Sequence, residues 1–283
     1  MKPRWRILTL MLPPVLLLLV FFVLPLTSMS TFSFRAGTFG DERHIFTLDN
    51  YRQFFENRVI QNLLLRSMWT ALQTSLLAVV FAYPVAYFLA FQAGSKRMTW
   101  LTILIVPAWT SYLLRILAWK LMLSSGGLIN TVLLQLGVIE EAQPILLYNR
   151  SAVIITLVYS WIPFVALPIF AALNRVGRNL LEAASDLGSP PWKTYLRVTL
   201  PLSLPGVYAG FIIVFIPTLG EWVTPALVGG VNGIMYGNAI QDQFVRALNW
   251  PMGSLMSFVM LGAVLLFLYL FTRVGRLRDL AGV

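Results

Sequence analysis

The chain has 283 residues, of which 58% are hydrophobic and 11% are charged, and its formal net charge is +10. A soluble domain carries about 25% charged residues, so this chain has too little charge to cover a surface that faces water, and a soluble globular protein is excluded. It contains no cysteine and one histidine, His44. This composition argues against a disulfide framework, a thiolate metal site and a site built on several histidines.

Apolar segments run almost from one end of the chain to the other, which predicts an all-α polytopic membrane protein with one integral domain over residues 1–283. A helix needs about 20 mostly apolar residues to cross the hydrocarbon core. The six expected transmembrane helices lie at residues 7–29, 63–91, 100–123, 151–173, 204–228 and 253–274.

The first apolar segment follows a basic N-terminus, as in a signal peptide. It is too long for one and lacks a clear small-residue cleavage site, so we expect it to be retained. The polar loop that follows contains His44, which we expect to be solvated. Near the end of this loop, Thr47–Tyr51 predicts a turn into a short amphipathic helix that carries Phe54 and Phe55.

Prolines lie inside several of the later spans, which a membrane helix tolerates when its neighbours satisfy the freed carbonyl groups. Pro84 lies in the second span, and Pro107 lies in the third together with Arg115 and Lys120. The fifth span is interrupted by the helix-breaking residues Pro217, Gly220 and Pro225.

Lysine and arginine are distributed unevenly between the two sides that six crossings create. The two termini and the loops after the second and fourth spans contain twelve of them, whereas the opposite side contains seven. Because cytoplasmic loops carry an excess of positive residues, we expect both termini and the polar segment 174–203 to lie in the cytoplasm.

That polar segment predicts two short helices joined by a tight turn. Asn179–Leu187 can form the first helix, with Glu182 in its first turn, where a carboxylate suits the helix dipole. Gly188 supplies the left-handed residue that ends a helix. Ser189 and Pro190 then fit the cap and the first position of the second helix. We expect this helix–turn–helix to lie against a membrane face.

The same segment contains Glu182-Ala183-Ala184, Gly188 four residues after the last alanine, and Val198-x-Leu200-Pro201 ten residues after that glycine. The pattern resembles the EAA loop in permeases of type I, binding-protein-dependent ABC importers, where isoleucine is commoner at the position of Val198. The resemblance implies a six-helix permease fold in which the EAA loop, residues 174–203, docks into a separate ATPase. The residues implied in this coupling are Glu182, Ala183, Ala184, Asp186 and Gly188.

In that role, Glu182 would make a polar contact with a groove of the ATPase, the two alanines would allow close approach, and Gly188 would form the bend. The chain contains no Gly-x-x-x-x-Gly-Lys-Ser/Thr loop that would bind a nucleotide phosphate. We therefore expect a transport subunit and not an enzyme, without a cofactor of its own. ATP and Mg²⁺ would bind to the partner ATPase.

Three residues are candidates for the transport pathway. Two of them, Glu221 and Arg115, are ionisable, and ionisable side chains inside spans are costly and often mark function. Glu221 and Trp222 lie in the broken part of span five, where a carboxylate beside an indole ring suits an ammonium cargo. Glu221 could instead pair with Arg115 or cap the resumed helix. Arg115 requires a partner or a watery cavity, and it could also hold an anionic cargo.

A second resemblance rests on IPTLGEWVTP at residues 216–225, on Tyr236-Gly237-Asn238 and on Ser111–Arg115. These residues look like those of spermidine/putrescine permeases, although Glu221 and Trp222 stand where aspartate and phenylalanine are common. The resemblance implies polyamine import across the bacterial inner membrane by alternating access. The implied partners are a second homologous permease, an ATPase dimer and an extracytoplasmic solute-binding protein. The net charge of +10 would suggest nucleic acid in a soluble protein, but in this chain we interpret it as a topology signal and as contact with membrane lipid, with no nucleic acid.

Other functions stay open at this point. The same machinery could carry another small organic or anionic solute. A stand-alone secondary transporter would need ion-coupling carboxylates near the midplane, and Glu221 alone qualifies. A membrane anchor or sensor without transport would explain neither the EAA loop nor the broken fifth span.

Overall fold

The computed structural model describes residues 4–37, 43–141 and 147–280. Within these ranges the regular secondary structure is helical, as the sequence predicts, except for one two-stranded hairpin that it does not predict. Six helical segments are long and apolar enough to cross a membrane. They are Thr9–Ser33, Arg58–Gln92, Tyr112–Gln135, Arg150–Leu173, Pro191–Leu219 and Trp250–Arg273.

The chain folds as two compact units, which are described separately. One consists of Leu63–Asn238 and contains every candidate site residue. The other consists of Met1–Asn62 together with Ala239–Val283. The single domain over residues 1–283 stays a prediction.

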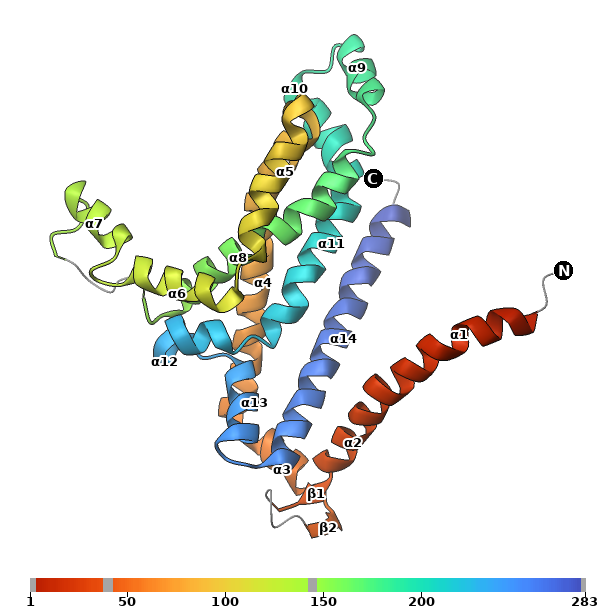
Figure 1. The fold of residues 1–283 in the computed structure, drawn as a ribbon, viewed down its shortest axis with the longest axis vertical. Coiled ribbons are helices and arrows are strands. Elements are labelled where there is room, and N and C mark those ends of the chain that lie inside the picture. Colours follow the sequence, from red (N-terminus) through yellow and green to blue (C-terminus); the bar gives the residue numbers. More distant parts are fainter. Residues whose placement is uncertain (1–3, 38–42, 142–146, 281–283) are drawn as a thin grey trace. The chain divides into compact units, whose positions relative to one another are not determined.

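The unit that contains the N-terminal segment is built around two apolar helical segments (Figure 1). Phe32 and Trp250 approach each other where these segments pack, with ring centroids 6.2 Å apart. The predicted amphipathic helix is present and buries Phe54, whereas Phe55 is exposed. His44, expected in a loop, lies in a strand that pairs with the other strand antiparallel. The elements are α1 (Arg4–Leu18), a π-helical turn (Leu19–Val23), α2 (Leu24–Ser33), β1 (Arg35–Ala36), β2 (Arg43–Phe46), α3 (Asp49–Glu56) and α14 (Trp250–Leu280).

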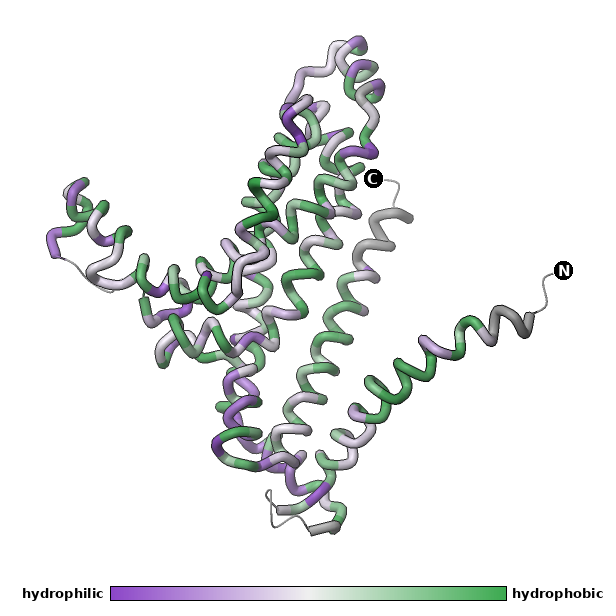
Figure 2. The backbone as a smooth tube through the Cα atoms, viewed as in Figure 1, coloured by the Kyte–Doolittle hydropathy of each residue, from purple (hydrophilic) through white to green (hydrophobic). Residues whose placement is uncertain are grey.

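The other unit is built around three long helices that lie side by side, α4, α8 and α11 (Figure 1). These three helices consist mostly of hydrophobic residues, whereas hydrophilic residues gather at α9, beyond one end of the helices (Figure 2). The α-helices are α4 (Arg58–Tyr87), α5 (Arg97–Ile105), α6 (Tyr112–Leu123), α7 (Leu128–Gln135), α8 (Arg150–Leu173), α9 (Arg178–Asp186), α10 (Pro191–Thr194), α11 (Leu200–Leu219), α12 (Gly230–Gly233) and α13 (Tyr236–Val245). Short 3₁₀ or π turns lie between them at Phe88–Gln92, Gly94–Lys96, Val106–Trp109, Tyr195–Thr199 and Pro225–Gly229.

Two glycines spaced four residues apart bring α11 close to α8. A Cβ atom on Gly206 would lie 2.5 Å from the carbonyl oxygen of Pro168, and one on Gly210 would lie 2.9 Å from Val165. Small residues at this spacing are how membrane helices approach closely, since lipid supplies no hydrophobic drive for association. At the α9 end, the hydroxyl of Tyr83 on α4 bonds to that of Ser203 on α11 at 2.8 Å.

The expected third span, residues 100–123, is wrong as one continuous helix. It is divided into α5 and α6 by the turn at Val106–Trp109 and by extended residues Thr110 and Ser111. Pro107 lacks the N–H group that would continue the helical hydrogen bonds. The third of the six apolar segments is Tyr112–Gln135, which includes α6, the turn at Ser124–Gly127 and α7.

The expected fifth span, residues 204–228, is also shifted. A continuous helix runs from Pro191 through the π turn at Tyr195–Thr199 to Leu219, so the second half of the EAA loop belongs to the fifth span. Pro217 lies inside α11 without ending it. The break comes at Gly220–Trp222, and the helix resumes at Val223, two residues before the π turn that begins at Pro225.

Candidate functional site

The turn of the EAA loop ends α9 with the hydrogen bonds of a Schellman motif. The N–H of Ser189 donates to the carbonyl of Ala184 at 3.0 Å, and that of Gly188 donates to Ser185 at 2.8 Å. Gly188 has φ +75°, which confirms the predicted left-handed residue. The bend that follows α9 is thus fixed by backbone geometry that glycine adopts without strain.

The boundaries of the two short helices differ from the prediction. The first begins at Arg178, so Glu182 lies beyond the first turn, which contains no acidic residue. The second begins at Pro191, with Pro190 extended as its cap. A residue that precedes proline is disfavoured in the helical region, so Pro190 cannot easily begin the helix and Ser189 is left outside the cap.

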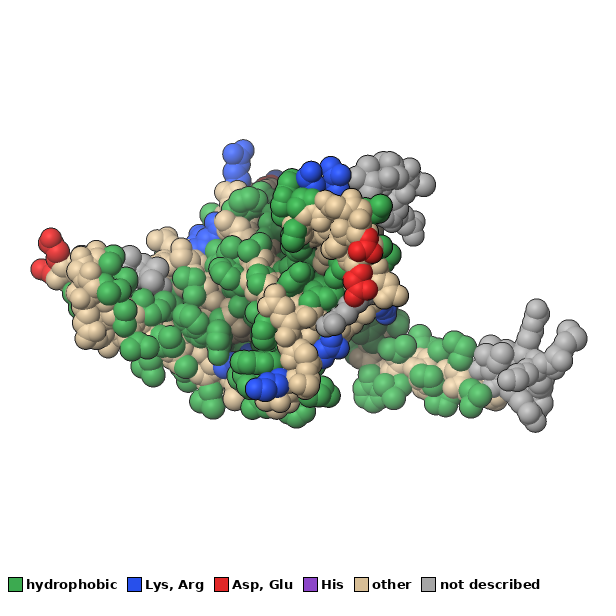
Figure 3. Space-filling model, turned by 90° about the horizontal axis from the view of Figure 1, so that it is seen from above, with side chains coloured by type: hydrophobic (Ala, Val, Ile, Leu, Met, Phe, Trp, Pro, Cys, Tyr) green, Lys and Arg blue, Asp and Glu red, His purple; other side chains and the backbone are tan. Residues whose placement is uncertain are grey.

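The EAA loop presents an open face. Glu182, Ala183 and Asp186 are exposed, Ala184 is half-buried, and the side chain of Leu187 is 88% exposed. In the view from above, charged side chains form a few small groups on a surface that is mostly hydrophobic (Figure 3). A protruding helix with exposed carboxylates and an exposed leucine can dock into a groove of another protein.

The C-terminal part of the EAA loop packs against the rest of the unit. Thr194 and Thr199 are buried, and the ring of Tyr195 packs edge-on against that of Tyr83 on α4, with centroids 5.8 Å apart. The helix from Pro191 to Leu219 is continuous, so the second half of the EAA loop and the fifth span are parts of one helix.

The break in the fifth span is organised around the carboxylate of Glu221. Its Oε1 accepts hydrogen bonds from the N–H groups of Val223 at 2.9 Å and Thr224 at 3.1 Å. Its Oε2 accepts one from the hydroxyl of Tyr112 at 2.8 Å. Glu221 therefore caps the resumed helix, which is one of the two structural roles that the sequence left open.

The start of α13 supports the same break from the other side. The side-chain amide of Asn238 donates to the carbonyl of Trp222 at 2.7 Å and accepts from the N–H of Met235 at 3.0 Å. A Cβ atom on Gly237 would lie 2.5 Å from the carbonyl oxygen of Gly220, so only glycine allows this close approach. The backbone of the break is thus held between α6 and α13.

Glu221 and Trp222 differ in what they offer to a ligand. The hydrogen bonds of the Glu221 carboxylate are made with Tyr112, Val223 and Thr224. Trp222 is 45% exposed. The pair can attract a cation through the charge and offer an aromatic face, but the carboxylate is already positioned by structure.

Arg115 does not pair with Glu221 in the described part of the chain. Its Nη1 donates to the carbonyl of Ser160 at 3.3 Å, and its guanidinium carbon lies 5.8 Å from the centre of the Tyr112 ring. Tyr112 therefore lies beside both charged residues and bonds to the acidic one. Arg115 faces a separate cleft.

A family model described as binding-protein-dependent transport system inner membrane component matches residues 4–280. The chain belongs to this family. The spermidine/putrescine transport system permease protein PotB of Escherichia coli (strain K12) is 38% identical over 234 residues, 82% of this chain and 84% of that protein. PotB of Haemophilus influenzae is 34% identical over 230 residues, 79% of this chain and 78% of that protein.

The permease also shares its fold with a solved importer. A chain in the crystal structure of a bacterial alginate ABC transporter, in complex with alginate pentasaccharide-bound periplasmic protein, matches with a TM-score of 0.69 at 18% identity. The match covers 94% of the permease and 93% of that chain. With its six apolar helices, the permease is a multi-pass inner-membrane transport subunit of the ABC importer fold.

Sequence reasoning missed the residues that hold the break together. Tyr112, Gly237 and Asn238 were part of the resemblance to polyamine permeases but received no role. Their roles depend on contacts between segments more than 100 residues apart, such as Tyr112 with Glu221, or 16 residues apart, such as Asn238 with Trp222. The motif Tyr236-Gly237-Asn238 was the available signal.

Proposed function

We propose that this permease is the transmembrane subunit of an ATP-driven importer of polyamines such as spermidine and putrescine. The observation that carries the proposal is its 38% identity to PotB over more than four fifths of both chains. The break in the fifth span supports a cationic cargo, because it holds a carboxylate and a half-exposed indole ring side by side.

In this proposal, the termini and the EAA loop lie in the cytoplasm, and an extracytoplasmic binding protein delivers the cargo to the opposite side. The excess of lysine and arginine at the termini and in the loop supports that orientation. A second, homologous permease completes the pathway. Glu221 and Trp222 lie along it, and Arg115 lies in the same bundle.

A separate ATPase dimer, which carries ATP and Mg²⁺, supplies the energy. Closure of the dimer displaces α9 through contacts with Glu182, Ala183, Ala184 and Asp186, and Gly188 keeps the bend. The continuous helix from Pro191 to Leu219 carries the displacement to the break at Gly220–Trp222. The spans then alternate between outward and inward access.

The decisive experiment is uptake by proteoliposomes that contain the permease with its associated second permease and ATPase, supplied with its binding protein. We expect ATP-dependent uptake of labelled spermidine or putrescine, which unlabelled polyamine reduces and an anionic solute does not. Uptake of an anionic or zwitterionic solute alone would reject the polyamine cargo. Uptake by the permease alone, without ATPase, would reject the importer mechanism in favour of a secondary transporter.

A further inference from the structure

Arg115 is an arginine without a carboxylate partner in the described part of the chain, where the ion pairs are Arg52–Glu56 and Arg246–Asp242. Among the residues that the structure describes, its guanidinium makes one hydrogen bond, the 3.3 Å contact with the carbonyl of Ser160. Its Nε is buried and has no hydrogen-bond partner within the same described ranges. A charge in this state requires compensation from outside the described contacts.

The contact with Ser160 places the guanidinium near the middle of α8. Ser160 lies ten residues after Arg150, the first residue of α8, and thirteen before Leu173, the last. At a rise of 1.5 Å per residue, these separations are about 15 Å and 20 Å. The hydrocarbon core is about 30 Å thick, so the phosphate of a lipid headgroup lies too far away to pair with Arg115.

Arg115 lines a cleft of about 360 Å³ between α4, α5 and α8. Apart from Arg115, nearly all of its lining is aliphatic or aromatic, and its walls include Val85, Phe88, Trp100, Ile103, Tyr159 and Ile162. Such a lining suits apolar side chains and provides few polar groups that could replace the hydration shell of an ion. A cationic polyamine would also be repelled by the guanidinium, so the cleft fits neither water nor the proposed cargo.

We propose that this cleft receives a transmembrane helix of the second permease, and that an aspartate or glutamate on that helix accepts hydrogen bonds from Arg115. The inference rests on the proposed function, which supplies the second permease. An intramembrane carboxylate provides the missing charge at the required depth, and the lipid-like surface of a helix fits the apolar walls. Arg115 then determines which permease pairs with this one.

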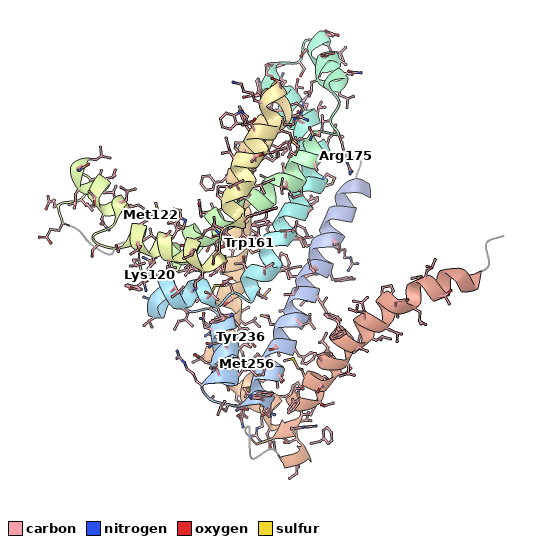
Figure 4. All side chains as sticks on the ribbon, in the orientation of Figure 1. Lys120, Met122, Trp161, Arg175, Tyr236 and Met256 are labelled. Carbon is pink, nitrogen blue, oxygen red and sulfur yellow. The ribbon has the colours of Figure 1, made fainter. Side chains whose placement is uncertain are left out.

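Charge reversal tests the pair in the assembled complex. We expect Arg115→Leu to lower co-purification of the second permease with the tagged chain several-fold, and Arg115→Glu to lower it at least tenfold. The matched control is Lys120→Leu, on the same helix α6 (Figure 4), whose ammonium lies 5.8 Å from the centre of the Tyr148 ring. We expect it to assemble within twofold of the wild type.

Rescue identifies the partner residue. In the Arg115→Glu background, each Asp and Glu within the spans of the second permease is replaced by Arg, and one replacement should restore assembly. Wild-type assembly of both Arg115 variants, or failure of every replacement to restore it, overturns the proposal. So does a second permease without an acidic residue in its spans.

A second measurement does not depend on the folding of these variants. The chain has no cysteine, so Ile103→Cys, at a position that is 56% exposed on the cleft wall, can be cross-linked to single cysteines in a cysteine-free second permease. We expect cross-links to the helix that carries the acidic residue, and their absence from every span overturns the proposal. Rescue in a complex that imports no polyamine would uphold the pairing while rejecting the cargo.

Discussion

The hydroxyl of Tyr112 lies 2.8 Å from the carboxylate of Glu221, to which it donates a hydrogen bond across 109 positions of the chain. The same hydroxyl lies 2.8 Å from that of Thr224. Through these contacts the first turn of α6 is joined to the helix that resumes after the break in the fifth span. The break is therefore a structured element of the permease, held to α6 by the Tyr112 hydroxyl.

Removal of the Tyr112 hydroxyl should loosen this coupling. We expect Tyr112→Phe to lower the melting temperature of the purified permease, because a hydrogen bond to a charged group contributes about 1.5–3 kcal/mol. Tyr269→Phe, at an exposed position on α14, is the control and should leave the melting temperature unchanged. Equal melting temperatures for the wild type and both variants would contradict the role given to Tyr112.

Substitution of Glu221 separates its charge from its capping role. Glu221→Gln keeps an oxygen that can accept from Val223 and Thr224, so we expect normal assembly with reduced polyamine uptake. Glu221→Ala also loses the cap, which costs about 0.5–2 kcal/mol, and should lower the melting temperature as well. Unchanged uptake by Glu221→Gln would make Glu221 a structural residue only.

Gly237→Ala should disrupt the break by steric conflict. The added methyl group would lie 2.5 Å from the carbonyl oxygen of Gly220 and 2.7 Å from that of Glu221. Overpacking of this kind costs about 1–3 kcal/mol, so we expect a lower melting temperature and lower uptake. Gly262→Ala on α14, where the methyl group meets open space, should not destabilise the permease, and an equal effect of both variants would refute the close approach.

Gly188→Val tests the bend of the EAA loop. The position has φ +75° with open space around it, so the cost, about 1–2 kcal/mol, comes from backbone strain alone. We expect normal membrane insertion with loss of uptake and of binding-protein-stimulated ATP hydrolysis. Gly137→Val is a matched control, since Gly137 has φ +69° and equally open surroundings outside the loop. If both variants transport alike, the bend is not part of coupling.

Reversal of an exposed charge tests docking without a change in packing. Glu182 is exposed on α9, and exposed substitutions usually change stability by less than about 0.5 kcal/mol. We therefore expect Glu182→Lys to retain the melting temperature but to lose uptake and recovery of the ATPase in pull-downs. Glu140→Lys, also exposed but far from the EAA loop in sequence, should behave like the wild type.

The sequence by itself determined the class of protein, the number of apolar crossings and the turn at Gly188. These features depend on local composition and on conformations that one residue type adopts readily, as with a glycine at φ +75°. The EAA spacing was equally local. Helix boundaries beside prolines were not fixed by the local pattern, because a proline lacks an N–H donor and also restricts the residue before it. The turn that contains Pro107 divides the expected third span, and Pro190 and Pro191 set where the helix after Gly188 begins.

Only the tertiary structure decided the role of Glu221 and showed that Arg115 does not pair with it. The sequence left open whether these two residues pair, and in the fold the Glu221 carboxylate instead accepts hydrogen bonds from Tyr112, Val223 and Thr224. It also showed that Gly237 lies directly against the carbonyl oxygen of Gly220, with no space for a side chain. The physical reason is that a charge inside a membrane must find a partner through packing between distant helices, and no local pattern records which partner that is.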